Sequence, residues 1–177
     1  TPGVSNYMLG IKDPDYPLYR KIAIPTKADD ITKCKNTTDD TTMAQCPTKA
    51  DRGWYAVLEN FGKVTNEPTA HRSSALFPVY EPTTSLNKCT LGDAYVCARD
   101  AECGTDISKK ILGKNSAAKK LKNCLHVGQG VLSKIIIFAD KWYANIAGQS
   151  AGANKDLATG TTSGGFVKGE RSSWKSN

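Results

Sequence analysis

Short apolar stretches ended by Pro, Gly, Asn or Asp recur along the chain. Their aromatic and β-branched content predicts strands. The predicted strands cover residues 7–12, 18–24, 53–58, 63–65, 74–81, 93–98, 131–138 and 141–147. We expect Asn60-Phe61-Gly62 to join the third and fourth of these in a hairpin, and Ala139-Asp140 to join the last two in another. The pattern therefore predicts a mainly β, antiparallel fold.

Two segments depart from the strand pattern. Residues 116–125 are rich in Ala, Lys and Leu, with Ser116 as a candidate N-cap, and predict one short helix. Residues 148–165 are heavy in Gly, Ala, Ser and Thr and predict a loop before the apolar pair Phe166-Val167. A polar tail follows, with Trp174 as its expected anchor.

Length and composition are those of an ordinary globular domain. The chain has 177 residues, of which 39% are hydrophobic and 23% charged, and we expect residues 1–177 to form a single β-rich module. Apolar runs such as residues 135–139 are far below the roughly 20 residues of a transmembrane helix, so no membrane span is expected. Because residue 1 is Thr without a charged and apolar leader before it, we expect a processed product or a piece of a longer protein.

The net charge of +7 raises the question of nucleic-acid binding. The densest basic cluster lies in a polar segment without an aromatic residue on which a base could stack, and it comprises Lys109, Lys110, Lys114, Lys119, Lys120 and Lys122. The five arginines are scattered, whereas phosphate and guanine contacts favour clustered Arg. We therefore expect no nucleic-acid partner, and a solvated basic face that adheres weakly to anionic surfaces.

Six cysteines form an even set without any C-x-x-C pair. They are Cys34, Cys46, Cys89, Cys97, Cys103 and Cys124. This spacing favours structural disulfides over zinc, iron–sulfur or haem attachment and indicates an oxidising compartment, namely the periplasm, the cell surface or the exterior. His71 and His126 have no ligand-like spacing to these thiols, although Cys124 and His126 are close in sequence.

Six cysteines allow 15 pairings, and the sequence does not choose among them. Proximity suggests Cys34–Cys46, which would close the polar, Thr-rich loop of residues 35–42. The remaining four would close local loops as Cys89–Cys97 and Cys103–Cys124, with the other arrangements still open.

One motif suggests catalysis. Gly148-Gln149-Ser150-Ala151-Gly152 matches the G-x-S-x-G elbow of α/β-hydrolases and follows a predicted strand. Both histidines precede Ser150, however, and the chain lacks the alternating strands and helices of a parallel sheet. A serine hydrolase using Ser150 is therefore a minor alternative, and we expect no enzyme.

Metal and cofactor motifs are also missing. Asp13-Pro14-Asp15 and Asp39-Asp40 place carboxylates together, but neither a calcium loop nor a phosphate-binding loop follows the known spacing. We interpret these residues as turn formers and expect no metal and no cofactor. Asn36-Thr37-Thr38 matches the N-glycosylation triplet, a common chance match.

Several segments resemble one family in the same order. Residues 51–58, with Gly53-Trp54-Tyr55, and residues 62–68 resemble the "GWY…L…GE(K/R)V…P" segment of PilY-type proteins, the tip-associated biogenesis factors and adhesins of type IV pili. Further similar segments are residues 7–13 ("YGIWD"), residues 89–95 followed by Cys103-Gly104 ("C…GG…LYALD"), residues 127–133 with Gly128, Gly130 and Ser133 ("G.G..S"), and residues 171–175 with Arg171 and Trp174 ("R.SWRE").

The resemblance implies propeller-blade-like strands and a place at the C-terminal end of a larger pilus-associated propeller protein. Because 177 residues supply only two or three blades of about 40 to 50 residues, open edges would remain. The expected partners are then a pilin or the N-terminal part of the parent protein. Alternatively, these strands form a compact disulfide-tied β domain. The family's calcium loop and its adhesive von Willebrand-like domain have no counterpart in this sequence.

The sequence thus predicts a non-enzymatic, disulfide-stabilised, extracellular or cell-surface module reached through the periplasm. It would bind proteins or surfaces through strand edges and through the loops of residues 35–42 and 148–165. The main alternative is a structural subunit or coat of an extracellular filament, which would self-assemble.

Overall fold

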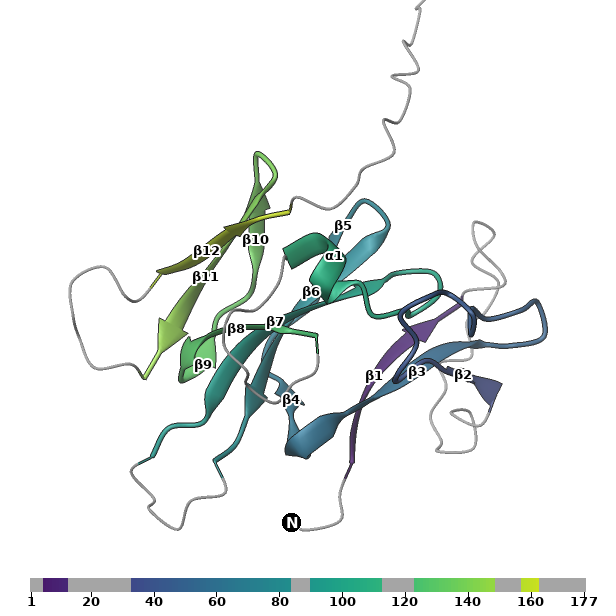
Figure 1. Ribbon diagram of the computed structural model, residues 1–177, viewed down its shortest axis with the longest axis horizontal. Coiled ribbons are helices and arrows are strands. Elements are labelled where there is room, and N and C mark those ends of the chain that lie inside the picture. Colours follow the sequence, from purple (N-terminus) through teal and green to yellow (C-terminus); the bar gives the residue numbers. More distant parts are fainter. Residues whose placement is uncertain (1–4, 13–32, 84–89, 113–122, 149–156, 163–177) are drawn as a thin grey trace, which may run out of the picture.

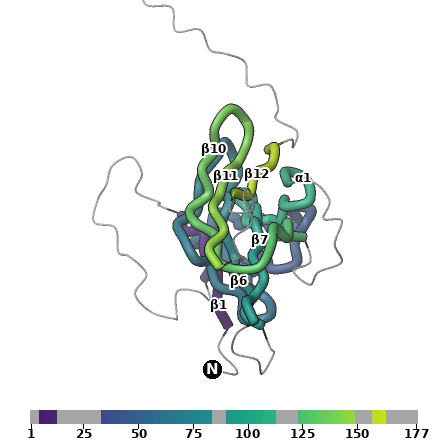
Figure 2. Tube along the Cα trace, turned by 90° about the vertical axis from the view of Figure 1, so that its left-hand side faces the viewer, coloured from purple at the N-terminus to yellow at the C-terminus, as the bar shows by residue number. Residues whose placement is uncertain are grey.

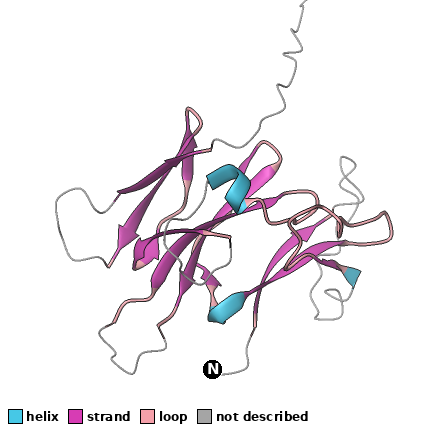
Figure 3. Ribbon diagram, in the orientation of Figure 1, coloured by secondary structure: helices cyan, strands magenta, loops and turns pink. Residues whose placement is uncertain are grey.

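Strands make up about half of the described residues and are the main secondary structure (Figures 1 and 3). The computed structural model describes residues 5–12, 33–83, 90–112, 123–148 and 157–162. The strands are β1 (Asn6–Ile11), β2 (Lys35–Asn36), β3 (Gly53–Leu58), β4 (Lys63–Val64), β5 (Thr69–His71), β6 (Ser74–Glu81), β7 (Asp93–Asp100), β8 (Leu125–Gln129), β9 (Val131–Leu132), β10 (Ile136–Phe138), β11 (Lys141–Ala147) and β12 (Leu157–Thr161). Within these residues one α-helix occurs, α1 (Ser108–Leu112), besides a 3₁₀ turn at Glu59–Phe61. No helix of the described part is long and apolar enough to cross a membrane.

The strands form three sheets, and the central sheet packs between the other two. The first has the order β1-β3-β2, the central one β4-β6-β7-β8 with β5 also on β6, and the third β10-β11-β12 with β9 also on β11. Figure 1 shows the first sheet to the right of the central strands and the third to the left, and Figure 2 shows the third sheet in front of them. All pairings are antiparallel except the two-residue contact of β2 with β3. The predicted antiparallel β class is confirmed.

The central sheet is buried on both faces. Phe77 and Val79 of β6 and Tyr95 of β7 pack with Leu58 of the first sheet. Alternate residues of the same two strands pack on Trp142, Ala144 and Ile146 of the third sheet, in a cluster that includes Leu76, Ala94, Val96 and Ala98. Successive side chains of a strand point to opposite faces, so the nearly continuous apolar sequence of β6 and β7 serves two cores.

The two outer sheets repeat one plan. Trp54-Tyr55-Ala56 in β3 and Trp142-Tyr143-Ala144 in β11 both bury the Trp and Ala toward the central sheet and leave the Tyr on the outer face. Opposite each Trp on the antiparallel neighbour lies a glycine, Gly10 in β1 and Gly160 in β12. A Cβ on either glycine would lie under 3 Å from the indole ring, so the indole occupies the space that a side chain would need.

Of the two hairpins predicted from the sequence, one forms and the other does not. Ala139 and Asp140 have φ of 49° and 60° and close the predicted hairpin of β10 and β11. The hairpin predicted between residues 53–58 and 63–65 is wrong, because β4 pairs with β6 of the central sheet. Asn60 and Phe61, with φ of 52° and 58°, form the turn through which the chain passes from the first sheet to the central one.

Other predicted segments need correction. The strand expected over residues 131–138 is divided into β9 and β10, and the loop expected over residues 148–165 contains β12. The short helix lies at Ser108–Leu112, and Leu125, the end of the predicted helix, belongs to β8. The predicted strand at 18–24, most of the predicted helix, the pair Phe166-Val167 and the tail lie outside the described residues.

Two disulfides join segments that are distant in sequence. Cys46 bonds to Cys103, 57 residues away, and Cys97 bonds to Cys124, 27 residues away. The three pairings favoured by proximity, Cys34–Cys46, Cys89–Cys97 and Cys103–Cys124, are therefore wrong. Tertiary contacts bring the bonded cysteines together. Strands β7 and β8 are neighbours in the central sheet, and the loop before β3 is hydrogen-bonded to the turn that follows β7. Cys34 is buried, and Cys89 lies outside the described residues.

Candidate protein-binding surfaces

The GWY segment anchors the first sheet. Trp54 is buried between Gly10 and Gly104, and its Nε1 donates a hydrogen bond of 3.1 Å to the carbonyl of Ala101. Gly53 has a φ of 152°, and a Cβ there would meet the carbonyl oxygen of Gly10 at 1.9 Å. Only glycine fits this close approach. Gly53 and Trp54 therefore fix β3 against β1 and the turn after β7, which leaves Tyr55 on the outer face.

The outer face of the first sheet is apolar. Tyr7, Leu9 and Ile11 of β1 are 44%, 42% and 50% exposed and lie on one face because strand residues alternate. Tyr55 pairs with Leu9 in the register, and its ring meets that of Tyr7 edge-on with centroids 6.0 Å apart. We call this row of four side chains face 1. Contiguous apolar surface of this kind commonly marks a protein interface.

The third sheet has a corresponding outer face. Ile136 and Phe138 of β10 are 63% and 72% exposed, and Leu157 of β12 is 53% exposed. Ile136 pairs with Tyr143, whose neighbours in β11 are buried, so these side chains lie on the side away from the central sheet. We call Ile136, Phe138, Tyr143 and Leu157 face 2. Faces 1 and 2 thus lie at opposite ends of the stack.

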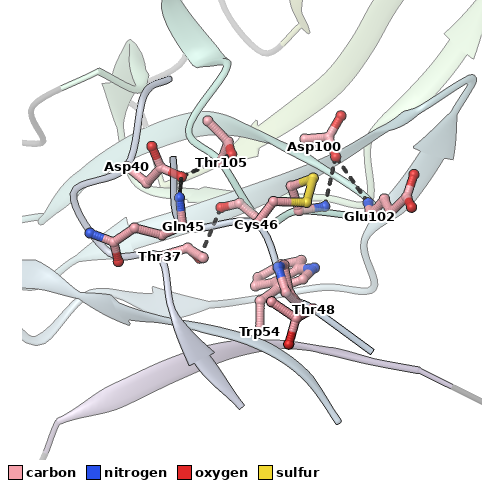
Figure 4. Close-up of a disulfide and its surroundings, with 12 residues drawn as sticks. Thr37, Asp40, Gln45, Cys46, Thr48, Trp54, Asp100, Glu102 and Thr105 are labelled. Atoms are coloured by element: carbon pink, nitrogen blue, oxygen red, sulfur yellow. Dashed lines mark hydrogen bonds between the residues drawn. A yellow bond between two sulfur atoms is a disulfide. The ribbon is translucent and has the colours of Figure 1, made fainter. Parts of the chain in front are cut away.

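The Thr-rich loop is tied to the body of the protein. Thr37 and Asp40 are buried, and the carboxylate of Asp40 accepts hydrogen bonds from the amide and the hydroxyl of Thr42. It also accepts from the amide of Gln45 and the hydroxyl of Thr105, as Figure 4 shows. The Cys46–Cys103 disulfide closes the same segment. Residues 35–46, which we call the clasp, therefore have in part a structural role. The sequence had indicated that this loop would present itself to a binding partner.

Arg99 holds the clasp from the central sheet. Its guanidinium is buried and donates to the carbonyl oxygens of Thr37 at 2.9 Å, Gly104 at 2.7 Å and Thr38 at 3.1 Å. Burial lowers the pKa of Arg99, and the charges of Asp106, Asp39 and Asp40 oppose that shift. Because one side chain satisfies three carbonyls, Arg99 fixes the spacing between this loop and the end of β7.

The ionised form of Asp40 stabilises the clasp. Burial acts to raise the pKa of Asp40, but the hydrogen bonds from Thr42, Gln45 and Thr105 outweigh it, and the pKa lies below its ordinary value of 3.8. A lowered folded-state pKa means stability that is present above the unfolded value and is lost as pH falls through the folded value.

We expect Asp40→Asn to lower the free energy of unfolding by about 1–3 kcal/mol at pH 7, because an amide cannot accept the hydrogen bonds made to both carboxylate oxygens. The difference from the wild type should shrink as pH falls below 3.8, where the wild type protonates. Urea unfolding at pH 7 and pH 3 measures both quantities. Glu102→Gln, at an exposed carboxylate, is the control. An Asp40→Asn effect that is the same at both pH values would contradict this role.

A cleft of about 250 Å³ opens between the clasp and the central sheet. Its floor includes Leu58, Phe77 and the Cys97–Cys124 disulfide, and polar residues such as Asp39, Asp106 and Ser108 line it. The Ser108 hydroxyl donates to the Ala98 carbonyl at 3.1 Å and accepts from the Ala98 amide at 2.8 Å. That hydroxyl thus completes the backbone pairing at the end of β7, and we assign the cleft no reaction.

Each histidine lies beside an aspartate. His126 Nε2 is 2.9 Å from Asp93 Oδ1, and His71 Nε2 is 3.7 Å from Asp140 Oδ1. Burial raises the pKa of Tyr95, next to His126, and its hydrogen bond with Glu81 raises it further. The described residues contain no group of three or more His, Cys, Asp or Glu side chains that could hold a metal ion.

The other sequence-predicted site residues have structural positions. Gly130 has a φ of 124°, and a Cβ there would lie 2.2 Å from the carbonyl oxygen of Ala147. Ser133 bridges β9 and β10 to β11, since its amide donates to the Asn145 carbonyl and its hydroxyl accepts from the Asn145 amide, both at 2.9 Å. Gly128 lies in β8 opposite Ala94. Ser150, Arg171 and Trp174 lie outside the described residues.

Of the residues of faces 1 and 2, the sequence singled out Tyr55, as part of the GWY segment, and did not predict the two faces as sites. A signal was present in the run Ile135-Ile136-Ile137-Phe138, which is apolar on both strand faces, and in the repeated Trp-Tyr-Ala segments. No protein-family model, curated protein or solved structure matches the chain.

Proposed function

We propose that the chain is a non-enzymatic, cell-surface binding module of the PilY type that docks onto protein partners through the outer faces of its sheet stack. One observation supports this most strongly. The central sheet is covered on both faces, whereas faces 1 and 2 expose large apolar side chains at the two ends of the stack. The partner is a pilin or the N-terminal part of a longer parent protein.

The blade-like arrangement supports the resemblance to a propeller. β5, β6, β7 and β8 follow one another as an antiparallel meander, and β10, β11 and β12 continue with a second. Packed four-stranded antiparallel sheets are the units of a propeller, and each sheet packs against the next. A stack of packed sheets of this kind would continue at both ends into further sheets.

The disulfides support the compartment. Within the described residues, Cys46–Cys103 and Cys97–Cys124 form disulfides, and such bonds persist in the periplasm, at the cell surface and outside the cell. A module that acts on pili would fold and form its disulfides in the periplasm. The positive net charge adds a weak attraction to anionic surfaces.

Charges placed on face 2 test this proposal. The double variant Ile136→Lys/Phe138→Lys should bind its partner at least about tenfold more weakly, because two lysines would be desolvated in an apolar interface. The matched control is Met43→Lys/Phe61→Lys, which makes the same change at two exposed apolar residues outside both faces. Co-purification of partner chains from the surface of the cells that make the protein, quantified by mass spectrometry, is the measurement. Equal losses for both double variants, or none for either, would contradict docking through face 2.

A filament subunit is the second candidate. The observation in its favour is that the two apolar faces lie at opposite ends of one stack, so face 1 of one copy could meet face 2 of the next, an arrangement that extends without closing. Concentration-dependent assembly of the purified, oxidised chain in light scattering would support this function. A monomer at all concentrations would favour a different partner.

A further inference from the structure

The outer edge of β1 has backbone groups directed away from the sheet. Among the described residues β1 pairs with β3 alone, from Asn6 opposite Leu58 to Ile11 opposite Gly53. The ladder continues with the amide of Lys12, which donates to the Arg52 carbonyl at 2.9 Å. Backbone groups of a strand alternate between its two sides, so Asn6, Met8 and Gly10 face β3. Tyr7, Leu9 and Ile11 therefore direct their N–H and C=O groups to the free edge.

The other side of β3 confirms this alternation. There the carbonyl of Tyr55 accepts from the amide of Thr37 at 2.9 Å, and the amide of Val57 donates to the hydroxyl of Thr38 at 3.0 Å. Tyr55 and Val57 thus face β2, which leaves Trp54, Ala56 and Leu58 to face β1.

The same three residues of β1 carry the exposed side chains of face 1. Tyr7, Leu9 and Ile11 thus offer an incoming strand three amides, three carbonyls and an apolar row at once. Most other edges are shorter, since β2 and β4 have two residues each and β5 and β10 have three. Long exposed edges of this kind are templates for pairing unless they are blunted by charge, Pro or bulges.

β12 is the equivalent edge of the third sheet, and it differs in one respect. Its residues Ala158 and Gly160 pair with Ala144 and Trp142, as Met8 and Gly10 pair with Ala56 and Trp54. Its outward row is Leu157, Thr159 and Thr161, so two hydroxyl side chains replace the large apolar ones. The edge of β12 has the same backbone plan without the same apolar row and is a natural internal control.

Basic residues gather where β1 ends. The amide of Lys12 bonds to the Arg52 carbonyl, and the amide of Arg52 bonds to the Lys33 carbonyl, so Lys12 is the nearest of the three to the free edge and Lys33 the farthest. Lys12 and Lys33 are exposed, and the Lys12 ammonium donates to the Thr48 carbonyl at 2.6 Å and lies near Asp51. An acidic residue at the end of an incoming strand would complement this charge.

We propose that the free edge of β1 receives an extended strand from a protein partner, with apolar side chains at alternate positions and an acidic residue near the Ile11 end. This inference rests on the proposed function for the identity of the partner, a pilin or the remainder of a parent protein. The main-chain hydrogen bonds would supply affinity, and the row of Tyr7, Leu9 and Ile11 would supply selectivity for apolar side chains.

A synthetic peptide tests the edge without any knowledge of the native partner. The probe is a nine-residue peptide of alternating Val and Thr with Asp at both ends, and the control peptide has Lys in place of Asp. On addition of the probe to the oxidised chain, we expect amide exchange at Tyr7, Leu9 and Ile11 to slow by about tenfold or more, measured by NMR. Met8 and Gly10, already bonded to β3, should exchange slowly throughout. Unchanged exchange at the three outward amides would overturn the proposal.

Matched proline variants separate the edge from the fold. Leu9→Pro removes an outward amide and should weaken probe binding by about tenfold or more, whereas Thr159→Pro makes the same change on β12 and should leave it within about twofold. Equal effects of the two variants would overturn the assignment to β1. The exchange experiment uses the unaltered chain and therefore decides the question even if Leu9→Pro does not fold.

The failures of the two proposals differ. If the native partner co-purifies with the chain while Tyr7, Leu9 and Ile11 exchange in the complex as fast as in the isolated chain, edge pairing is wrong and the binding function stands. If the peptide protects the edge but no partner chain is found at the cell surface, edge pairing stands and the proposed function is wrong.

Discussion

Replacing Cys46 and Cys103 by serine should lower the free energy of unfolding by about 2–5 kcal/mol. The bond joins residues 57 apart in sequence and closes the segment whose buried residues Thr37 and Asp40 contact the end of β7. Without it, that segment would rely on the hydrogen bonds of Asp40 and Arg99 and on the 2.7 Å bond from the Asp106 amide to the Asp40 carbonyl. Urea unfolding followed by tryptophan fluorescence measures the loss.

The second disulfide is the matched comparison. Cys97 and Cys124 are 27 residues apart, so the chain-entropy relation predicts a loss about 0.7 kcal/mol smaller for Cys97→Ser/Cys124→Ser than for the first pair. A loss below about 1 kcal/mol for Cys46→Ser/Cys103→Ser would show that the hydrogen bonds hold the clasp without the covalent link. That result would contradict a stabilising role for the Cys46–Cys103 disulfide.

Removing either buried indole should also be severe. Trp54→Ala and Trp142→Ala should each lower the free energy of unfolding by about 3–5 kcal/mol, because each leaves a cavity between an outer sheet and the rest of the stack. Trp54→Ala should in addition loosen β1, since Gly10 packs directly against the ring.

Phenylalanine substitutions distinguish the two sites. Trp54 Nε1 donates to the Ala101 carbonyl, so Trp54→Phe loses a hydrogen bond worth about 0.5–1.5 kcal/mol as well as packing. Within the described residues Trp142 Nε1 has no hydrogen-bond partner, so Trp142→Phe removes a buried polar group that gains nothing there. We therefore expect Trp54→Phe to be the more destabilising of the two in chemical unfolding. The reverse order would contradict the assigned contacts.

The strands with the clearest apolar pattern could be predicted from sequence, and the order of their pairing could not. Residues 53–58, 74–81 and 93–98 form β3, β6 and most of β7 because their aromatic and β-branched side chains pack well in a sheet. β12 was missed because Leu-Ala-Thr-Gly-Thr has little apolar content of its own, and it becomes a strand by pairing with β11. Tertiary pairing outweighs local propensity in this segment.

The sequence predicted the kind of binding surface, namely open strand edges, but not which residues form it. The sequence indicated open strand edges and a missing partner, and β1 and β12 are such edges within the described residues. It directed attention to the Thr-rich loop, whereas burial of Thr37 and Asp40 depends on a disulfide and on Arg99, which is 62 residues from Thr37 in sequence. Likewise, the register of β10 with β11 determines that the side chains of Ile136 and Phe138 face outward, and the sequence does not show this register.

The central claim is that the ends of the sheet stack bind another polypeptide at the cell surface. Photo-crosslinking from position 138 in the cells that make the protein, followed by non-reducing mass spectrometry, tests it most directly, because Phe138 is the most exposed residue of face 2. We predict a cross-link to a pilin or to a larger fragment of a parent protein, in a chain that retains its disulfides, and far less cross-linking from position 43. A chain with free thiols that forms no cross-link from position 138 would contradict both the compartment and the function.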